Sequence, residues 1–492
     1  MIAILLIFIP LLLGVVTFFL PRGNVARIVS LISSMATLVV SLLGLTVFSN
    51  KKYLQFSADW LPGLGSAFSL QLDGMGQLLC LLTAISFPII FISTWNREYK
   101  KAANFFALML LSQAGLMGVF LAMDALVFYF FWELALIPVY FLCSIWGGEK
   151  RIAATFKFFI YTFVGSVLML VALIYLQSQT ADQSFSIQSF YNLQLDYNTQ
   201  DWLFALMFIA FAIKMPVFPF HTWQPDLYEQ SPNAVTMVLS GIMVKMGVFA
   251  VIRWLLPVLP AGSFALGETT VTVLAVIGMI YASLLAFRQD DLKRLIAYSS
   301  IAHIGLMVVA IFSETQLAMQ GVMIQMFNHG INIIGLWIIV EVIERKYGTR
   351  KLSELGGLAQ KAPVMSILLL IITLANISLP LTNSFVGEFL MFSGIFSSNI
   401  YSYKILITVA AGICIILGAV YMLQMVQKII YGTTSAKTEN GEDIQMHEKV
   451  VLSIIVILII GIGLYPQPIL DLTQATTDAI LKEANVLHLL KK

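Results

Sequence analysis

Two proline-containing stretches decide how this chain folds. Residues 211–225 read FAIKMPVFPFHTWQP, and residues 376–388 read NISLPLTNSFVGE. Each lies within or beside an apolar run of about the length that crosses a bilayer, roughly 20 residues. Proline removes a backbone donor, and unpaired carbonyls at membrane depth are tolerated only against protein or water. The two stretches predict broken helices that line a polar path; the alternative is two unrelated kinks that only help packing.

The composition is that of a membrane protein that crosses the bilayer many times. The chain has 492 residues, of which 59% are hydrophobic and 11% charged, and its mean hydropathy is +0.90. Globular proteins carry about 25% charged residues. The net charge of +2 indicates no binding of nucleic acid. Cys80, Cys143 and Cys414 stand alone, so no iron–sulfur, zinc or haem-attachment site is predicted and the chain is expected to hold no cofactor.

The apolar runs predict an all-α polytopic membrane protein with fourteen spans. The first, MIAILLIFIPLLLGVVTFFL, lacks a basic start and a cleavage site, so it is expected to be retained. The spans lie near residues 2–20, 28–48, 74–95, 104–122, 125–146, 156–176, 203–221, 232–256, 271–287, 293–312, 316–340, 364–396, 404–430 and 450–465. Most of the 28 lysines and arginines fall on alternate connections, beginning with the first. Because cytoplasmic loops collect such residues, both termini are expected on the non-cytoplasmic side.

The two broken helices occupy matching places in two successive groups of five spans. If residues 104–256 form one unit and residues 271–430 another, each break falls in the fourth span. An odd number of spans makes two tandem units inverted relative to each other, an arrangement that points to an ion path in transporters. Residues 1–103 then hold the first three spans. Residues 431–492 hold the last span and, at 467–490, an expected amphipathic helix or ordinary terminal cap.

Four ionisable residues lie inside the predicted spans: Glu133, Lys214, Lys245 and Glu388. A lone charge at this depth costs ~2.5–3.5 kcal/mol, so such residues usually pair or line a wet path. Glu133 and Lys214 are predicted to interact, so that movement of the carboxylate controls whether the amine keeps its proton. The alternative is a permanent ion pair that joins two helices.

Lys245 and Glu388 are predicted to continue the path. Lys245 has no carboxylate in its own span and lies too deep to reach the interface, which favours wet surroundings. Glu388 follows the second break and is predicted to deliver protons outward; the alternative is that it caps the half-helix.

Three histidines fill the gaps between these groups. His303 and His329 lie mid-span, and His221 ends the first broken helix. Imidazole both accepts and donates a proton, as a relay requires, although each histidine taken singly fits a packing role equally well. Serines and asparagines on the same spans extend this polar line: Ser299, Ser300, Asn328 and Asn332. The spacing of the histidines predicts no metal site.

Several motifs together resemble the antiporter-like membrane subunits of respiratory complex I, and among them the M type (chain 4). They are WELALIPVYFL, FAIKMPVFPFHTWQPD, MVKMGVFAVIRW, LKRLIAYSSIAHIGLM, FNHGINIIGLW and LPLTNSFVGEFL, and they extend from the third span to the thirteenth. The L and N types place lysine where Glu388 stands, and the L type carries a long extra helix for which this chain has no room. The pattern H-x-W-L-P-D-A-H departs here to HTWQPDLY, with Gln224 and Tyr228 in place of leucine and histidine, and Leu381 replaces a common glycine.

The resemblance implies fourteen helices in two inverted units, with Glu133 and Lys214 as a modulating pair, Lys245 and the histidines as relay, and Glu388 as exit group. It implies a proton-translocating subunit of NADH:quinone oxidoreductase in a bacterial inner membrane, driven by redox chemistry in partner subunits. The expected partners are other membrane-arm subunits, further antiporter-like ones included, and lipid, with no soluble substrate other than protons. Two alternatives stay open: a subunit of an Mrp-type cation/proton antiporter, and a non-conducting structural subunit.

Overall fold

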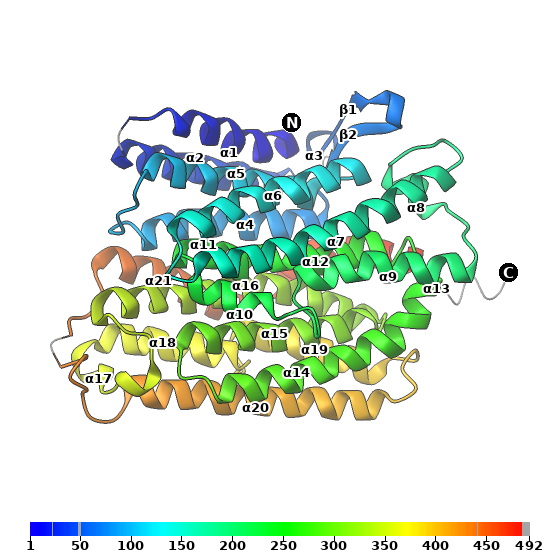
Figure 1. Ribbon diagram of the computed structural model, residues 1–492. Helices are drawn as coiled ribbons and strands as arrows, with labels where there is room; N and C mark the ends of the chain where they lie inside the picture. Colours follow the sequence, from blue (N-terminus) through cyan, green and yellow to red (C-terminus); the bar gives the residue numbers. More distant parts are fainter. Residues whose placement is uncertain (22, 48–50, 440, 485–492) are drawn as a thin grey trace.

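The long helices lie side by side along one common direction, with α1 and α2 at one edge of the bundle and α20 at the other (Figure 1). The computed structural model describes residues 1–21, 23–47, 51–439 and 441–484. The last part of the expected amphipathic helix, residues 485–490, and the end of the second predicted span, residue 48, lie outside the described residues.

The helices follow the predicted spans in order. In the first half they are α1 (Ile2–Phe18), α2 (Gly23–Thr46), α4 (Gly74–Ser93), α5 (Ala102–Leu121), α6 (Ala125–Trp146), α7 (Arg151–Gln179), α9 (Tyr197–Lys214), α10 (Trp223–Gln230), α11 (Asn233–Val238), η2 (Leu239–Met243), α12 (Val244–Ala250) and η3 (Val251–Leu255). In the second half they are α13 (Pro260–Gly262), η4 (Ser263–Val271), α14 (Thr272–Phe287), α15 (Leu292–Ile311), α16 (Gln316–Tyr347), α17 (Leu358–Lys361), α18 (Pro363–Asn376), α19 (Asn383–Ser397), α20 (Lys404–Ile430), α21 (Met446–Leu464) and α22 (Gln467–Ala484). Short helical turns also occur at α3 (Lys51–Leu54), η1 (Pro62–Leu64), α8 (Ile187–Tyr191) and η5 (Leu352–Glu354).

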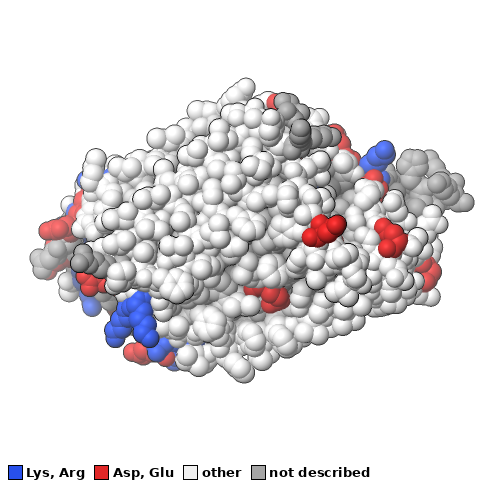
Figure 2. Space-filling model, turned by 90° about the horizontal axis from the view of Figure 1, so that it is seen from above, with Lys and Arg blue, Asp and Glu red and all other residues white. Residues whose placement is uncertain are grey.

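Among the described residues, eleven helical segments are long and apolar enough to cross a membrane, and α1 and α18 are shorter apolar helices. The exposed face in Figure 2 is mostly uncharged, with lysines and arginines confined to its two ends. The chain is therefore a multi-pass membrane protein, as its composition predicts. The count of fourteen and the inverted repeat stay predictions.

Aspartates determine where several of the spans begin. Asp73 precedes α4 and accepts a hydrogen bond from the backbone N–H of Gly76, and Asp124 does the same for α6. Asp291 caps α15, and Thr315 caps α16. Each side chain satisfies backbone donors that have no partner within the helix, and it also marks the boundary between polar connection and apolar span.

Both predicted breaks are present. The first interrupts the chain between α9 and α10, and the second lies between α18 and α19. At the first break the indole N–H of Trp223 donates to the carbonyl of Ile213 at 2.9 Å, and at the second the hydroxyl of Thr382 donates to the carbonyl of Leu379 at 2.7 Å. The Trp223 side chain thus takes over a carbonyl of the interrupted helix, whereas the carbonyl of Leu379 also accepts from the backbone N–H of Thr382 at 3.1 Å.

The expectation of helices alone is wrong for residues 55–71. Strands β1 (Gln55–Leu61) and β2 (Ser66–Gln71) form an antiparallel hairpin, closed at Gly65 with φ +73°. Long apolar runs do not predict this hairpin, because a short hairpin outside the membrane needs no such run. The expected terminal amphipathic helix is α22, which packs against α4 and α16; the hydroxyl of Thr476 accepts from the N–H of Gly74.

Candidate proton-relay site

Lys245 lies at the centre of the bundle, on α12 directly after the π-helical segment η2. The residue is fully buried. Its ammonium Nζ donates to the carbonyl of Ser240 at 2.8 Å and lies 2.8 Å from Nδ1 of His329 on α16. The predicted relay therefore contains a direct amine–imidazole contact in which a proton can be shared.

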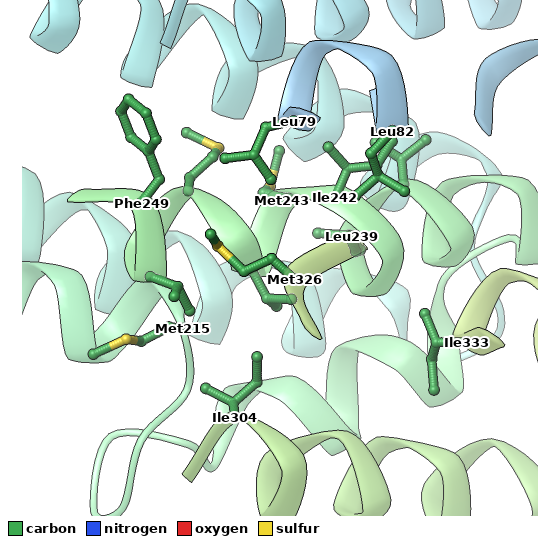
Figure 3. Packing of buried hydrophobic residues seen from close by; sticks show 14 of the residues in the cluster. Leu79, Leu82, Met215, Leu239, Ile242, Met243, Phe249, Ile304, Met326 and Ile333 are labelled. Atoms are coloured by element: carbon green, nitrogen blue, oxygen red, sulfur yellow. The ribbon is translucent and has the colours of Figure 1, made fainter. Parts of the chain in front are cut away.

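Apolar side chains pack around this contact, where wet surroundings were predicted for Lys245. Leu239, Ile242 and Met243 of η2 meet Leu79 and Leu82 of α4 (Figure 3). Met326 and Ile333 of α16 belong to the same buried cluster (Figure 3). Because unpaired polar groups are costly in such surroundings, the hydrogen bonds of Lys245 stabilise its buried position.

The two mid-span histidines lie between Lys245 and Glu388. The ring centroids of His329 and His303 are 5.5 Å apart, and Nδ1 of His303 lies 3.2 Å from Oε1 of Glu388 on α19. Among the described residues, Nε2 of His329 and Oε1 of Glu388 have no hydrogen-bond partner, so the two histidines, and His303 and Glu388, are close without being hydrogen-bonded. Four predicted residues from four different helices thus form one sequence of neighbours: Lys245, His329, His303, Glu388. We call it the relay row.

A small cavity adjoins the end of the relay row. His303, Glu388, Asn376 and Tyr421 contribute its polar lining, and its volume is about 20 Å³. A polar cavity of at least ~10–15 Å³ can hold one water molecule. Tyr421 and Asn376 both donate to the hydroxyl oxygen of Ser299, at 3.0 and 3.4 Å. Glu388 therefore has room for one hydrating water.

Lys214 and Glu133 occupy a different part of the bundle. Lys214 ends α9 at the first break and is buried, whereas Glu133 on α6 is half-buried at the surface of the bundle. Among the described residues no ion pair within 4.0 Å joins them, and Lys214 Nζ and Glu133 Oε1 both lack a hydrogen-bond partner. Lys214 Nζ instead lies 5.2 Å from the ring centroid of Trp132, the residue before Glu133. The structure brings the pair into one neighbourhood without direct contact.

His221 lies apart from the relay row. Its ring stacks on Phe218 at 5.6 Å between centroids and meets the edge of Tyr281 at 5.4 Å. Both contacts are aromatic, and its Nδ1 has no hydrogen-bond partner among the described residues. The structure thus joins His303 and His329 to the row and leaves His221 at the first break. Ser300 also lacks a partner for its hydroxyl.

Sequence reasoning missed a buried charged cluster where α16 approaches its end. The carboxylate of Glu341 accepts from Arg97 at 2.6 Å and from Asn233 at 2.5 Å. Glu344 accepts from the same Asn233 at 2.9 Å and lies 3.3 Å from the ammonium of Lys293. The predicted span stopped at residue 340, seven residues before the end of α16 and one residue before Glu341. The sequence did contain a signal for this cluster. Glu341 and Glu344 are spaced i, i+3, which places them on one face of a continuation of the helix that carries His329.

The charged cluster borders a large open cavity. The cavity measures about 630 Å³, and Glu341, Glu344, Lys293 and Asn233 form part of its wall. Outside the spans, Asp226 lies nearby on α10; burial acts to raise the pKa of its carboxyl, but hydrogen bonds from Lys157 and Arg294 hold that pKa below its usual range. Charged side chains with mutual partners therefore line this cavity and lie close to it.

Comparisons with known proteins identify the family of this chain. Residues 122–415 match the family model described as NADH:quinone oxidoreductase/Mrp antiporter, TM. The F(420)H(2) dehydrogenase subunit M of Methanosarcina mazei is 35% identical over 98% of this chain and 98% of its own length. The NADH-quinone oxidoreductase subunit M of Rickettsia prowazekii is 36% identical over 96% of this chain and 97% of its own.

Solved structures extend the likeness to three dimensions. A chain of respiratory complex I from Thermus thermophilus with bound NADH has a TM-score of 0.90 at 27% identity, covering 99% of this chain and 100% of that one. A chain of the Mrp complex from Dietzia sp. has a TM-score of 0.86 at 19% identity, covering 98% and 99%, which shows the shared fold alone. This chain belongs to the family of transmembrane subunits that NADH:quinone oxidoreductases share with Mrp antiporters.

Proposed function

We propose that this chain is the M-type proton-translocating subunit of a quinone-reducing membrane complex and does no redox chemistry itself. The relay row carries the proposal: four titratable side chains from four helices lie next to one another inside apolar packing. A non-conducting subunit has no need of them, because buried ionisable groups are expensive in a membrane. Relatives over the whole length are subunits named for NADH or F(420)H(2) oxidation.

In the proposed mechanism protons pass along the row by rearrangement of charge. Glu133, half-buried at the bundle surface, responds to a charge change in a neighbouring subunit. Its approach to Lys214 or withdrawal from it changes the field at Lys245. Lys245 then gives its proton to His329, which passes a proton to His303; His303 passes it to Glu388, which releases it outward. The energy comes from redox chemistry in partner subunits.

The proposal keeps the arrangement of two inverted units, residues 104–256 and 271–430, with residues 1–103 before them and 431–492 after them. Each unit contains one broken helix, and the relay row begins in the first unit and ends in the second. Both termini lie on the non-cytoplasmic side of a bacterial inner membrane, and other membrane-arm subunits flank the chain.

Substitution of Lys214 and Glu133 distinguishes a proton-conducting subunit from a structural subunit that does not conduct. We expect Lys214→Ala and Glu133→Gln to lower quinone-linked proton pumping in membrane vesicles while the complex stays assembled. Exposed Lys428→Ala is the matched control and should pump normally. Normal pumping in all three variants would favour the structural alternative.

Copurification tests the Mrp-type alternative, which the family model and the fold leave as the second candidate. Isolated from native membranes in mild detergent, the chain should be accompanied by flavin and iron–sulfur polypeptides and should support quinone reduction. A complex without such polypeptides that exchanges cations for protons would support the antiporter instead.

A further inference from the structure

A pair of buried asparagines joins α16 to the start of α19. Asn332 donates through Nδ2 to Oδ1 of Asn383 at 3.0 Å, and Asn383 donates through its own Nδ2 to Oδ1 of Asn332 at 3.0 Å. Asn332 Nδ2 also donates to the hydroxyl oxygen of Ser384 at 2.9 Å. Asn328 Nδ2 donates to the backbone carbonyl of Asn383 at 2.7 Å. All four residues are buried.

The two helices below this pair touch along glycines. A Cβ atom on Gly387 would lie 2.4 Å from Oε1 of Gln325, and one on Gly394 would lie 2.3 Å from the backbone nitrogen of Ala318. Rising residue numbers on α19 thus meet falling numbers on α16, so the helices are antiparallel and in backbone contact. Such contact sets the distance between the two helices but does little to prevent one from sliding along the other. Directional hydrogen bonds across the contact between α16 and α19, here called the seam, do prevent sliding.

The seam joins two members of the relay row. On α16, His329 lies between Asn328 and Asn332, and on α19, Glu388 lies five residues after Asn383. The break between α18 and α19 leaves the start of α19 without a continuous helix behind it. The amide pair is therefore a polar contact that fixes the position of Glu388 along α16, relative to His329 and to His303, whose Nδ1 lies 3.2 Å from Oε1 of Glu388.

We infer that Asn332 and Asn383 are positioning residues for proton transfer between His303 and Glu388. The inference rests on the proposed function and adds two residues to it that do not themselves carry protons. Amides suit the task because they remain neutral, so they hold the carboxylate in place without adding charge to the path.

The reciprocal geometry predicts that the two residues act as one unit. Removing either side chain leaves buried donors and acceptors of the other without a partner, which is costly in itself. The effects of the two single substitutions should therefore not add. A displacement of ~1 Å at a reacting group can lower a rate by about 10²-fold.

The test compares Asn332→Leu, Asn383→Leu and the double variant in the intact complex. We expect each to assemble and to lower proton pumping per quinone reduced by roughly 10- to 100-fold, with the double variant no worse than either single one. In a cryo-electron microscopy structure of the Asn332→Leu complex, the Glu388 carboxylate should have left His303. Thr373→Val, which changes a buried polar side chain of α18 away from the pair, is the matched control and should pump normally.

The remaining outcomes decide against the inference. Normal pumping in the leucine variants overturns it, and so does lost pumping with the Glu388–His303 contact unchanged. If the leucine variants fail to assemble, Asn383→Gln keeps a neutral amide and moves it by one methylene. A partial loss of pumping with a displaced Glu388 then supports the inference, and unchanged pumping overturns it. Lys245→Met in the same series separates the two hypotheses: normal pumping there refutes the proposed function itself.

Discussion

The two broken helices of this chain are both interrupted at a proline-containing stretch, but the contacts of their charged side chains differ. At the first break, Lys214 ends α9 with no hydrogen-bond partner for its ammonium, and Glu133 is half-buried at the bundle surface. At the second break, Glu388 touches His303, and the start of α19 is held by Asn332. In the proposed mechanism the first break receives a charge change from outside the chain, and the second passes a proton between side chains held in place.

The largest expected effect comes from the centre of the relay row. Lys245→Met keeps the apolar stem and removes the ammonium, so the contact with His329 at 2.8 Å loses its exchangeable proton. We expect pumping to fall by on the order of 10²-fold or more, a size typical of losing a positioned acid or base. Proton uptake by vesicles that contain the assembled complex measures it. Pumping that survives this change would refute the proposed function.

A somewhat smaller loss is expected at the second break. Glu388→Gln keeps the shape of the side chain but cannot carry a proton, while His303 retains the adjoining cavity of about 20 Å³. One water there offers His303 another acceptor. We expect pumping to fall less than in Lys245→Met, and acidification of the interior of inverted vesicles to show the difference. Equal losses in both variants would contradict this ranking.

A modest decrease in pumping is expected from a change near the first break that leaves the second break intact. Trp132→Leu removes the aromatic face that lies 5.2 Å from the ammonium of Lys214. A desolvated cation–π contact stabilises a charged amine by about 2 kcal/mol. We expect a decrease of a few-fold in pumping, with the relay row unchanged in structure. Trp60→Leu in the hairpin provides the control, and an equal decrease there would remove the special role of Trp132.

The smallest effect concerns stability outside both breaks. Burial and the neighbouring carboxylate of Glu268 raise the pKa of Glu314, in the connection from α15 to α16, to about 8. An unfolded glutamic acid titrates near ~4.3, so the folded state binds more protons between these values and stability falls as the pH rises through that window. Glu314→Gln should remove this loss of stability at higher pH, because the glutamine side chain does not titrate.

Thermal unfolding of the purified complex checks that expectation. Relative to wild type, Glu314→Gln should gain stability as the pH is raised from 5.5 to 8, and the gain should level off above the pKa of about 8. Glu439→Gln, which changes an exposed carboxylate, should show no such trend. A pH-independent difference between Glu314→Gln and wild type would show that Glu314 does not titrate as its surroundings indicate.

Part of the candidate site could be predicted from the chain, and part could not. Each residue of the relay row was predicted singly, because its type conflicts with its apolar span. The contacts of the row were not: Lys245 and His329 are separated by 84 residues, and no local pattern sets which helix faces meet. The prediction for Glu133 and Lys214 located the right neighbourhood, but no direct ion pair is present. Glu341 was missed because the apolar run ended one residue before it.

The sequence by itself determined that this chain enters a membrane, roughly where it crosses, and where two of its helices break. These are local properties, since the cost of placing a residue in hydrocarbon and the missing donor of a proline depend on that residue and its near neighbours. Only the tertiary structure decided which buried groups touch: Lys245 with His329, His303 with Glu388, Asn332 with Asn383. Those choices depend on how helices distant in sequence pack, and packing is a property of the whole bundle.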